Sequence, residues 1–131
     1  MIVKNVLFGL ILASASSALA RPDLNAFLNK PATSTDRLIR QIKTDPQVAD
    51  RYTRHYAMSK SEVIDYLSSL SPAQTNQDGV YTVYSVPDGG RLKSRTEIVK
   101  KGTLVFADMR KVPVLILKCG NPLSRGSSTR S

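Results

Sequence analysis

The fold is decided by residues 79–99, which read GVYTVYSVPDGGRLKSRTEIV. Before this stretch apolar residues recur at helical spacing, whereas after Gly79 they alternate with polar ones, as is typical of half-buried strands. Residues 80–86 are rich in Val and Tyr, and the glycines within 87–90 favour a tight turn. The stretch therefore predicts a hairpin in which residues 80–86 pair with residues 91–99.

Three helices are predicted on the amino-terminal side of this hairpin. Residues 36–43 have apolar residues on one face, and a second helix begins at Asp45-Pro46, with Asp45 as the N-cap and Pro46 at the first helical position. The buried side of the second helix is expected to contain Val48, Tyr52, His55 and Tyr56, with Arg51 and Arg54 outside it. Ser59 and Glu62 form a capping box for a third helix, which ends before Ser71-Pro72. Residues 23–29 are expected to form a short helical turn.

Two further strands are predicted on the carboxy-terminal side. Residues 103–107 follow the turn Lys100-Lys101-Gly102, and residues 112–118 contain four consecutive large apolar residues, which indicates a strand covered on both faces. The expected fold class is α+β, with about three amino-terminal helices packed on a four-stranded, mainly antiparallel sheet. We expect one domain over residues 21–123, helical in 21–72 and β in 80–123, and a disordered tail over 124–131.

Residues 1–20 have the pattern of a secretory signal peptide. A short region containing Lys4 precedes an apolar core over residues 6–12, and the segment ends in Ala18-Leu19-Ala20, which suits a signal peptidase. The alternative is an uncleaved anchor, but the apolar core is less than half the length that a membrane span needs. We therefore expect cleavage after Ala20 and a secreted, periplasmic or otherwise extracytoplasmic protein.

Positive charge is concentrated in the carboxy-terminal half. Residues 80–131 contain ten Lys and Arg against three Asp and Glu, whereas residues 21–79 contain eight against seven. Alternation along residues 91–99 places basic side chains on one face of a strand, and the next turn adds two more. The expected binding residues are Arg91, Lys93, Arg95, Lys100 and Lys101, with Arg110 and Lys111 as an extension and Tyr81 or Tyr84 as an aromatic supplement.

This basic face favours an anionic partner outside the cytoplasm, either an acidic envelope polymer or a lipid surface. The alternative is an ordinary solvated sheet face, because antiparallel sheets commonly expose one polar face. No specific nucleic-acid signature occurs in the sequence.

Cys119 is the one cysteine of the chain, so no intrachain disulfide can form. A buried thiol is the ordinary interpretation, and a disulfide-linked dimer through Cys119 is an alternative in an exported protein. As a nucleophile Cys119 would need a base, and His55 is the one histidine available. Cys119 and His55 are therefore weak catalytic candidates, and neither a cofactor nor a metal site is expected.

The carboxy-terminal part of the chain resembles a domain of uncharacterised exported bacterial proteins. The resemblance covers residues 83–123 and rests on GTLVF at 102–106, PVL at 113–115 and CGNPL at 119–123. It implies a bacterial source and a recurring Cys-Gly-Asn-Pro-Leu element, and it implies no activity.

Two functions remain open at this point. The first is a small exported binding or envelope-associated module without enzymatic activity, and it is favoured by the charge distribution. The second is a thiol-dependent enzyme or redox protein that uses Cys119.

Overall fold

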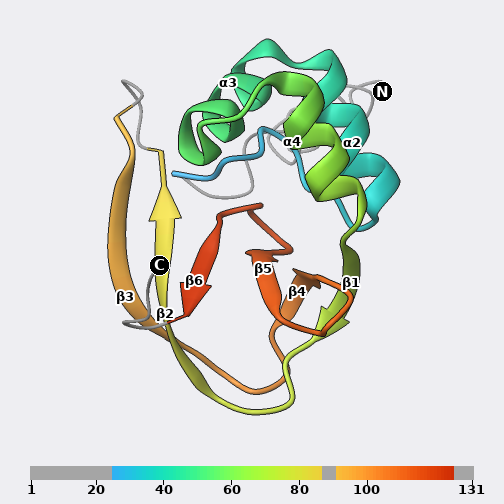
Figure 1. Cartoon of the computed structure of the whole chain (residues 1–131). Helices are drawn as coiled ribbons and strands as arrows, with labels where there is room; N and C mark the ends of the chain where they lie inside the picture. The colour runs from blue at the N-terminus through green and yellow to red at the C-terminus, as the bar shows by residue number, and fades with distance from the viewer. Residues whose placement is uncertain (1–24, 87–90, 126–131) are drawn as a thin grey trace, which may run out of the picture.

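The computed structural model describes residues 25–86 and 91–125 (Figure 1). The predicted signal peptide, the turn at 87–90 and residues 126–131 of the predicted tail lie outside the described residues. The described part contains three helices, all of which precede the strands in the chain, and six strands in two sheets.

The helices begin where local capping signals place them. They are α2 (Thr35–Thr44), α3 (Pro46–Tyr56) and α4 (Lys60–Ser68). The Asp45 carboxylate accepts a hydrogen bond from the Gln47 N–H at 3.0 Å, and Pro46 occupies the first turn of α3. At α4, the Ser59 hydroxyl accepts from the Glu62 N–H while the Glu62 carboxylate accepts from the Ser59 N–H. The predicted N-cap and capping box are therefore confirmed.

The segment before α2 differs from its prediction. Residues 25–29 form no helical turn, and Ala26, Phe27 and Leu28 are fully buried in an irregular conformation. The Leu28 N–H donates to the Cys119 carbonyl at 3.1 Å, and the Val86 N–H donates to the Asn25 carbonyl at 3.0 Å. The segment is fixed by partners distant in sequence, which a local pattern does not show.

Six short strands form two three-stranded antiparallel sheets, in the orders β1-β4-β5 and β3-β2-β6. Their bounds are β1 (Ser71–Gln74), β2 (Gly79–Ser85), β3 (Lys93–Val99), β4 (Leu104–Ala107), β5 (Pro113–Ile116) and β6 (Leu123–Arg125). The fold therefore combines helices and strands, but the prediction of a single four-stranded sheet is wrong.

Two strands that the sequence did not indicate account for this division. β1 contains Pro72 and pairs with β4, whereas β6 follows Pro122 and pairs with β2. Both strands are short and carry turn-forming residues at or beside their ends, so their pattern resembles that of loops. The β2–β3 hairpin is present as predicted, but the connection through Gly102, which has a φ of +88°, takes the chain into the other sheet.

The β4–β5 pair lies between two cores. Phe106 and Leu115 oppose each other and are buried together with helical residues such as Tyr52 and Leu38. Val105 belongs to a second core, which also contains residues of β2, β3 and β6. Its partner Ile116 packs against that second core. The prediction of a carboxy-terminal strand covered on both faces is therefore confirmed.

Candidate functional site

Two of the predicted basic residues, Lys93 and Arg95, lie on β3, which forms an edge of its sheet (Figure 1), and the other three lie just before or just after this strand. Lys93 pairs with Ser85, and Arg95 pairs with Val83, whose side chain is buried between the sheets. Residues directly opposite each other share a face, so Lys93 and Arg95 project on the core side of the sheet but at its exposed edge. We call Arg91, Lys93, Arg95, Lys100 and Lys101 the basic row, and all five are exposed.

Among the described residues, two carboxylates lie beside the basic row, those of Glu97 and Asp78. Glu97 pairs with Tyr81 across the strands and therefore shares the face of Lys93 and Arg95. Its carboxylate forms an ion pair with the Arg95 guanidinium. The other four cations have no carboxylate within ion-pair distance in the part of the chain that the structure describes.

The turn that carries Lys100 and Lys101 is held by the connection between β1 and β2. The Thr75 hydroxyl donates to the Lys100 carbonyl at 2.9 Å, and the Lys101 N–H donates to the Asp78 carboxylate at 2.7 Å. These bonds fix the backbone and leave both side chains exposed. The turn is thus a preformed end of the basic row.

The predicted additions to the row are not in place. Tyr81 is buried in the core between the sheets, and Tyr84 projects on the opposite face of β2, where its ring lies 4.6 Å from that of His55. The expected aromatic supplement is therefore wrong. Arg110 and Lys111 are exposed in the turn after β4, at the other end of that strand from Lys100 and Lys101.

Cys119 lies in the joint between the sheets and the helices, and its side chain is 2% exposed. The next residue, Gly120, accepts a hydrogen bond from the Tyr52 hydroxyl at 2.6 Å. The side-chain oxygen of Asn121 accepts from the Phe27 N–H at 2.9 Å. The Cys-Gly-Asn-Pro-Leu element therefore ties the buried segment before α2 and helix α3 to the end of β5.

Gly120 can be no other residue in this joint without rearrangement. Its φ is +72°, which favours glycine. A Cβ atom at this position would overlap the Tyr52 hydroxyl and would lie 2.5 Å from Cγ of Leu28. The element is explained by packing and hydrogen bonding, and this explanation requires no chemistry at the thiol.

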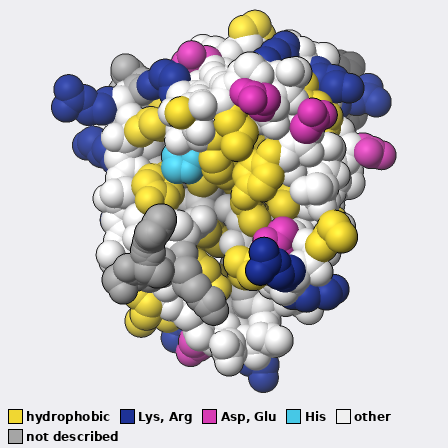
Figure 2. Space-filling view, in the orientation of Figure 1, with side chains coloured by type: hydrophobic (Ala, Val, Ile, Leu, Met, Phe, Trp, Pro, Cys, Tyr) yellow, Lys and Arg dark blue, Asp and Glu magenta, His cyan; other side chains and the backbone are white. Residues whose placement is uncertain are grey.

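His55 lies in a group of aromatic rings and is half-buried. Its ring centroid is 5.8 Å from that of Phe27, 4.5 Å from that of Tyr56 and 4.6 Å from that of Tyr84. Burial lowers the pKa of His55 from its ordinary value of 6.5 to about 4, so the ring is neutral near pH 7. Figure 2 shows hydrophobic side chains gathered on this face of the molecule, beside the histidine.

Arg51 was expected outside the buried stripe of α3, but it is only 9% exposed. Its guanidinium donates to the Phe27 carbonyl at 3.1 Å and to the Asn29 side-chain oxygen at 2.8 Å. A helical pattern does not reveal these partners, because they lie more than 20 residues away in sequence.

A second cationic surface lies along α2 and was not predicted. Lys30, Arg37 and Arg40 line an open groove with a volume of about 380 Å³. The Asp45 carboxylate at its rim already accepts hydrogen bonds from the Asn29 amide and the Gln47 N–H. The spacing of Arg37, Arg40 and Lys43 by three residues was the sequence signal for this surface.

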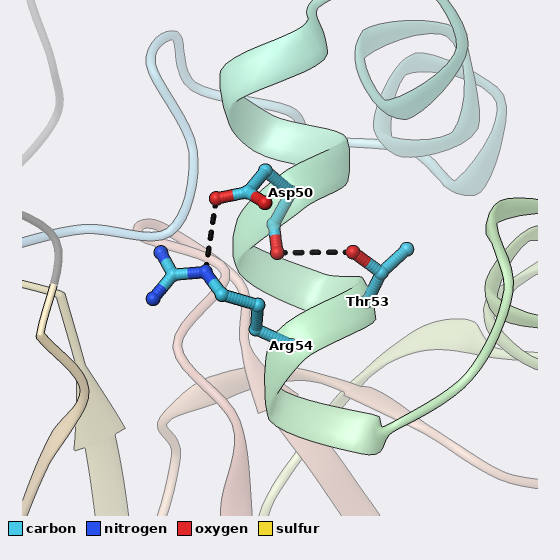
Figure 3. A network of polar contacts seen from close by, with 3 residues as sticks. All are labelled: Asp50, Thr53 and Arg54. Carbon is cyan, nitrogen blue, oxygen red and sulfur yellow. Dashed lines mark hydrogen bonds and ion pairs between the residues drawn. The ribbon is translucent and has the colours of Figure 1, made fainter.

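The exposed surface of α3 shows an ordinary use of charge. The Arg54 guanidinium pairs with the Asp50 carboxylate one turn earlier at 2.9 Å, and the Thr53 hydroxyl donates to the Asp50 carbonyl (Figure 3). The two charged side chains are 41% and 60% exposed, so the pair adds little stability.

Within residues 25–86 and 91–125, no three His, Cys, Asp or Glu side chains come together in a group that could hold a metal ion. In the same residues, none of the helices has the length and apolar character needed to cross a membrane.

Comparison with known proteins gives one match. Residues 22–131 match a family described as a domain of unknown function (DUF6777). No curated protein and no solved structure matches the chain.

Proposed function

The chain belongs to the DUF6777 family, and we propose that it is an exported, non-enzymatic binding domain that engages an anionic partner through the basic row. The observation that carries the proposal is the position of the row along and beside the edge strand β3, where five exposed cations lie near two described carboxylates, those of Glu97 and Asp78. An edge strand can be approached both from its face and from its side. The partners expected outside the cytoplasm are an acidic envelope polymer and a lipid surface.

Export is supported by two features of the chain. Residues 1–20 have the charge, apolar core and small-residue end of a signal peptide. The family match begins at residue 22, so the family domain starts after this segment. We propose that cleavage near Ala20 releases the domain outside the cytoplasm.

The charge arrangement favours binding over simple solvation. On α3 the exposed Arg54 is matched by Asp50 on the preceding turn, which is a local arrangement that needs no binding partner. Among the described residues, Arg95 is the one member of the basic row that has an ion-pair partner. Four like charges on an edge strand and its turn repel one another, and a multivalent anion would relieve that repulsion.

The thiol-dependent alternative has less support. Cys119 is 2% exposed, and its neighbours are engaged in the bonds of the joint. His55 is a poor partner for a thiolate because burial lowers its pKa to about 4 and so disfavours the imidazolium form. A disulfide-linked dimer stays a prediction, and it would require the joint to open. A non-reducing gel tests it directly.

The proposal is tested by measuring binding of the mature protein, recovered after export, to phosphatidylglycerol vesicles and to polyglutamate over a range of salt concentrations. The double variant Lys93→Glu, Arg95→Glu should bind at least about tenfold more weakly than the wild type at low salt. Salt should weaken the wild type much more than this variant.

The matched control is Arg37→Glu, Arg40→Glu on α2, which changes the net charge by the same amount. It should retain most of the binding. Equal losses in the two variants would mean that net charge alone attracts the anion, and undiminished binding by the β3 variant would exclude the basic row.

A further inference from the structure

The outer side of β3 is an open strand edge. β3 pairs with β2 on one side, and no described element lies beyond it on the other (Figure 1). In an antiparallel pair, alternate residues direct their N–H and C=O groups away from the partner strand, so roughly three or four of the residues of β3 present both groups outward. Within the described residues, none of these outward backbone groups forms a hydrogen bond.

The side chains of β3 differ between its two faces. Lys93, Arg95 and Glu97 project on the core side, and Ser94, Thr96 and Ile98 project on the outer side. Ile98 is 62% exposed, and its cross-strand partner Val80 is 53% exposed. The edge thus offers cations on one face and an apolar contact on the other.

We propose that β3 is a docking edge for an extended acidic segment of a partner protein, which adds to the sheet as a further antiparallel or parallel strand. This inference rests on the proposed function, and it takes an acidic peptide as the anion in place of an envelope polymer or a lipid surface. In strand addition, main-chain hydrogen bonds supply affinity and alternate side chains supply specificity. The segment would place acidic side chains opposite Lys93 and Arg95, and an apolar or Thr side chain opposite Ile98.

Charge argues against a second copy of this chain as the occupant. Two β3 edges paired about a twofold axis would bring their basic rows together, and like charges on paired strands destabilise the pairing. Lys on an edge strand is a common protection against such self-association. An acidic strand meets the same edge with complementary charge.

The other outer strands are less suited to this role. β5 and the residues just before β6 are joined by a bridge between Leu115 and Pro122, so these two edges face each other. β1 has four residues against seven in β3, and Pro72 gives it one N–H fewer. Its residues include no charged side chain. The combination of length, free donors and charge therefore distinguishes β3 from β1.

A lipid surface or a polysaccharide would use the cations but not the backbone edge. An extended peptide would use both the cations and the backbone edge. At about 3.3 Å per residue, β3 can pair with a peptide over a length of about 23 Å. A segment of six or seven residues with alternating acidic and apolar side chains is therefore the expected ligand.

The test uses a capped peptide of seven residues in which Glu alternates with Val or Thr, titrated against the same mature protein. Two N-methylated forms are compared with it, each blocking alternate backbone N–H groups. One methylated set faces β3 and the other faces solvent, so one form should bind roughly tenfold to a hundredfold more weakly while the other retains binding.

The outcomes separate strand addition from anion binding. If both methylated peptides bind as the parent does, while Lys93→Glu, Arg95→Glu abolishes binding, then strand addition is wrong and the proposed function stands. If the protein binds phosphatidylglycerol vesicles through the row but no peptide, the partner is a lipid surface and the inference is wrong. If the double variant binds the parent peptide as well as the wild type, the proposed function itself fails.

Discussion

Replacing Tyr52 by Phe removes one hydroxyl from the joint between α3 and the Cys-Gly-Asn-Pro-Leu element. That hydroxyl donates to the Gly120 carbonyl at 2.6 Å, and both groups are buried. The ring itself stays in place against Phe27, at a centroid distance of 5.0 Å. The variant therefore tests the hydrogen bond with little change in packing.

The variant should lower the free energy of unfolding, because the Gly120 carbonyl is left without this donor. An unsatisfied buried polar group costs about 1–3 kcal/mol. For a domain of about 100 residues, a loss of about 2 kcal/mol lowers the melting temperature by roughly 8–16 °C. The loss should be seen in the free energy of unfolding without a change in the m-value.

Urea unfolding followed by far-UV circular dichroism is the suitable assay, because the chain has no Trp. The control is Tyr66→Phe, which removes a hydroxyl from a side chain that is 37% exposed and should change the free energy of unfolding by about 0.5 kcal/mol or less. If Tyr52→Phe were no more destabilised than Tyr66→Phe, the element would not be a hydrogen-bonded joint and its thiol would need another explanation.

Two further predictions concern the side chains of His55 and Cys119. Burial lowers the pKa of His55 from 6.5 to about 4, so between these pH values the unfolded chain binds a proton that the folded protein does not. The free energy of unfolding should therefore fall by about 2 kcal/mol as the pH drops from 6.5 to 4, after allowance for the exposed part of the ring. The urea midpoint of the wild type should decrease with pH over this range, and that of His55→Phe should not. A decrease that persists in the variant would mean that other groups cause it. Cys119 should react with iodoacetamide only as fast as the protein unfolds, since it is 2% exposed, and reaction of the native protein at the rate of a free thiol would revive the enzyme hypothesis.

The helices could be predicted because their signals are local. Asp45 and Pro46 start α3, and Ser59 and Glu62 start α4, through bonds that span two or three residues. Arg51 shows the limit of this reasoning. Its polar partners, the carbonyl of Phe27 and the side chain of Asn29, come from a distant segment, so helical periodicity alone placed it wrongly at the surface.

The division into two sheets could not be predicted, because strand pairing depends on partners far apart in sequence. β1 pairs with β4 and β6 pairs with β2, although both short strands lie in stretches with the composition of turns. The β2–β3 hairpin, in contrast, joins neighbouring strands and follows from alternation and a turn.

The basic row was predicted from alternation, but two of its properties were not. The first is the carboxylate of Glu97, which the same alternation places on the face of Lys93 and Arg95 and which forms an ion pair with Arg95. The edge position of β3 depends on the order of the strands and has no local signal. It is this position that distinguishes a docking edge from a solvated face.

The most direct measurement for the basic row is a map of backbone amide shifts in the ¹⁵N-labelled mature protein as the acidic peptide is added. The largest shifts should occur in β3 and in Lys100 and Lys101, and they should disappear at high salt. Shifts centred on Lys30, Arg37 and Arg40 would assign binding to the groove of α2 instead. Uniformly small shifts would show that the basic row binds no acidic strand.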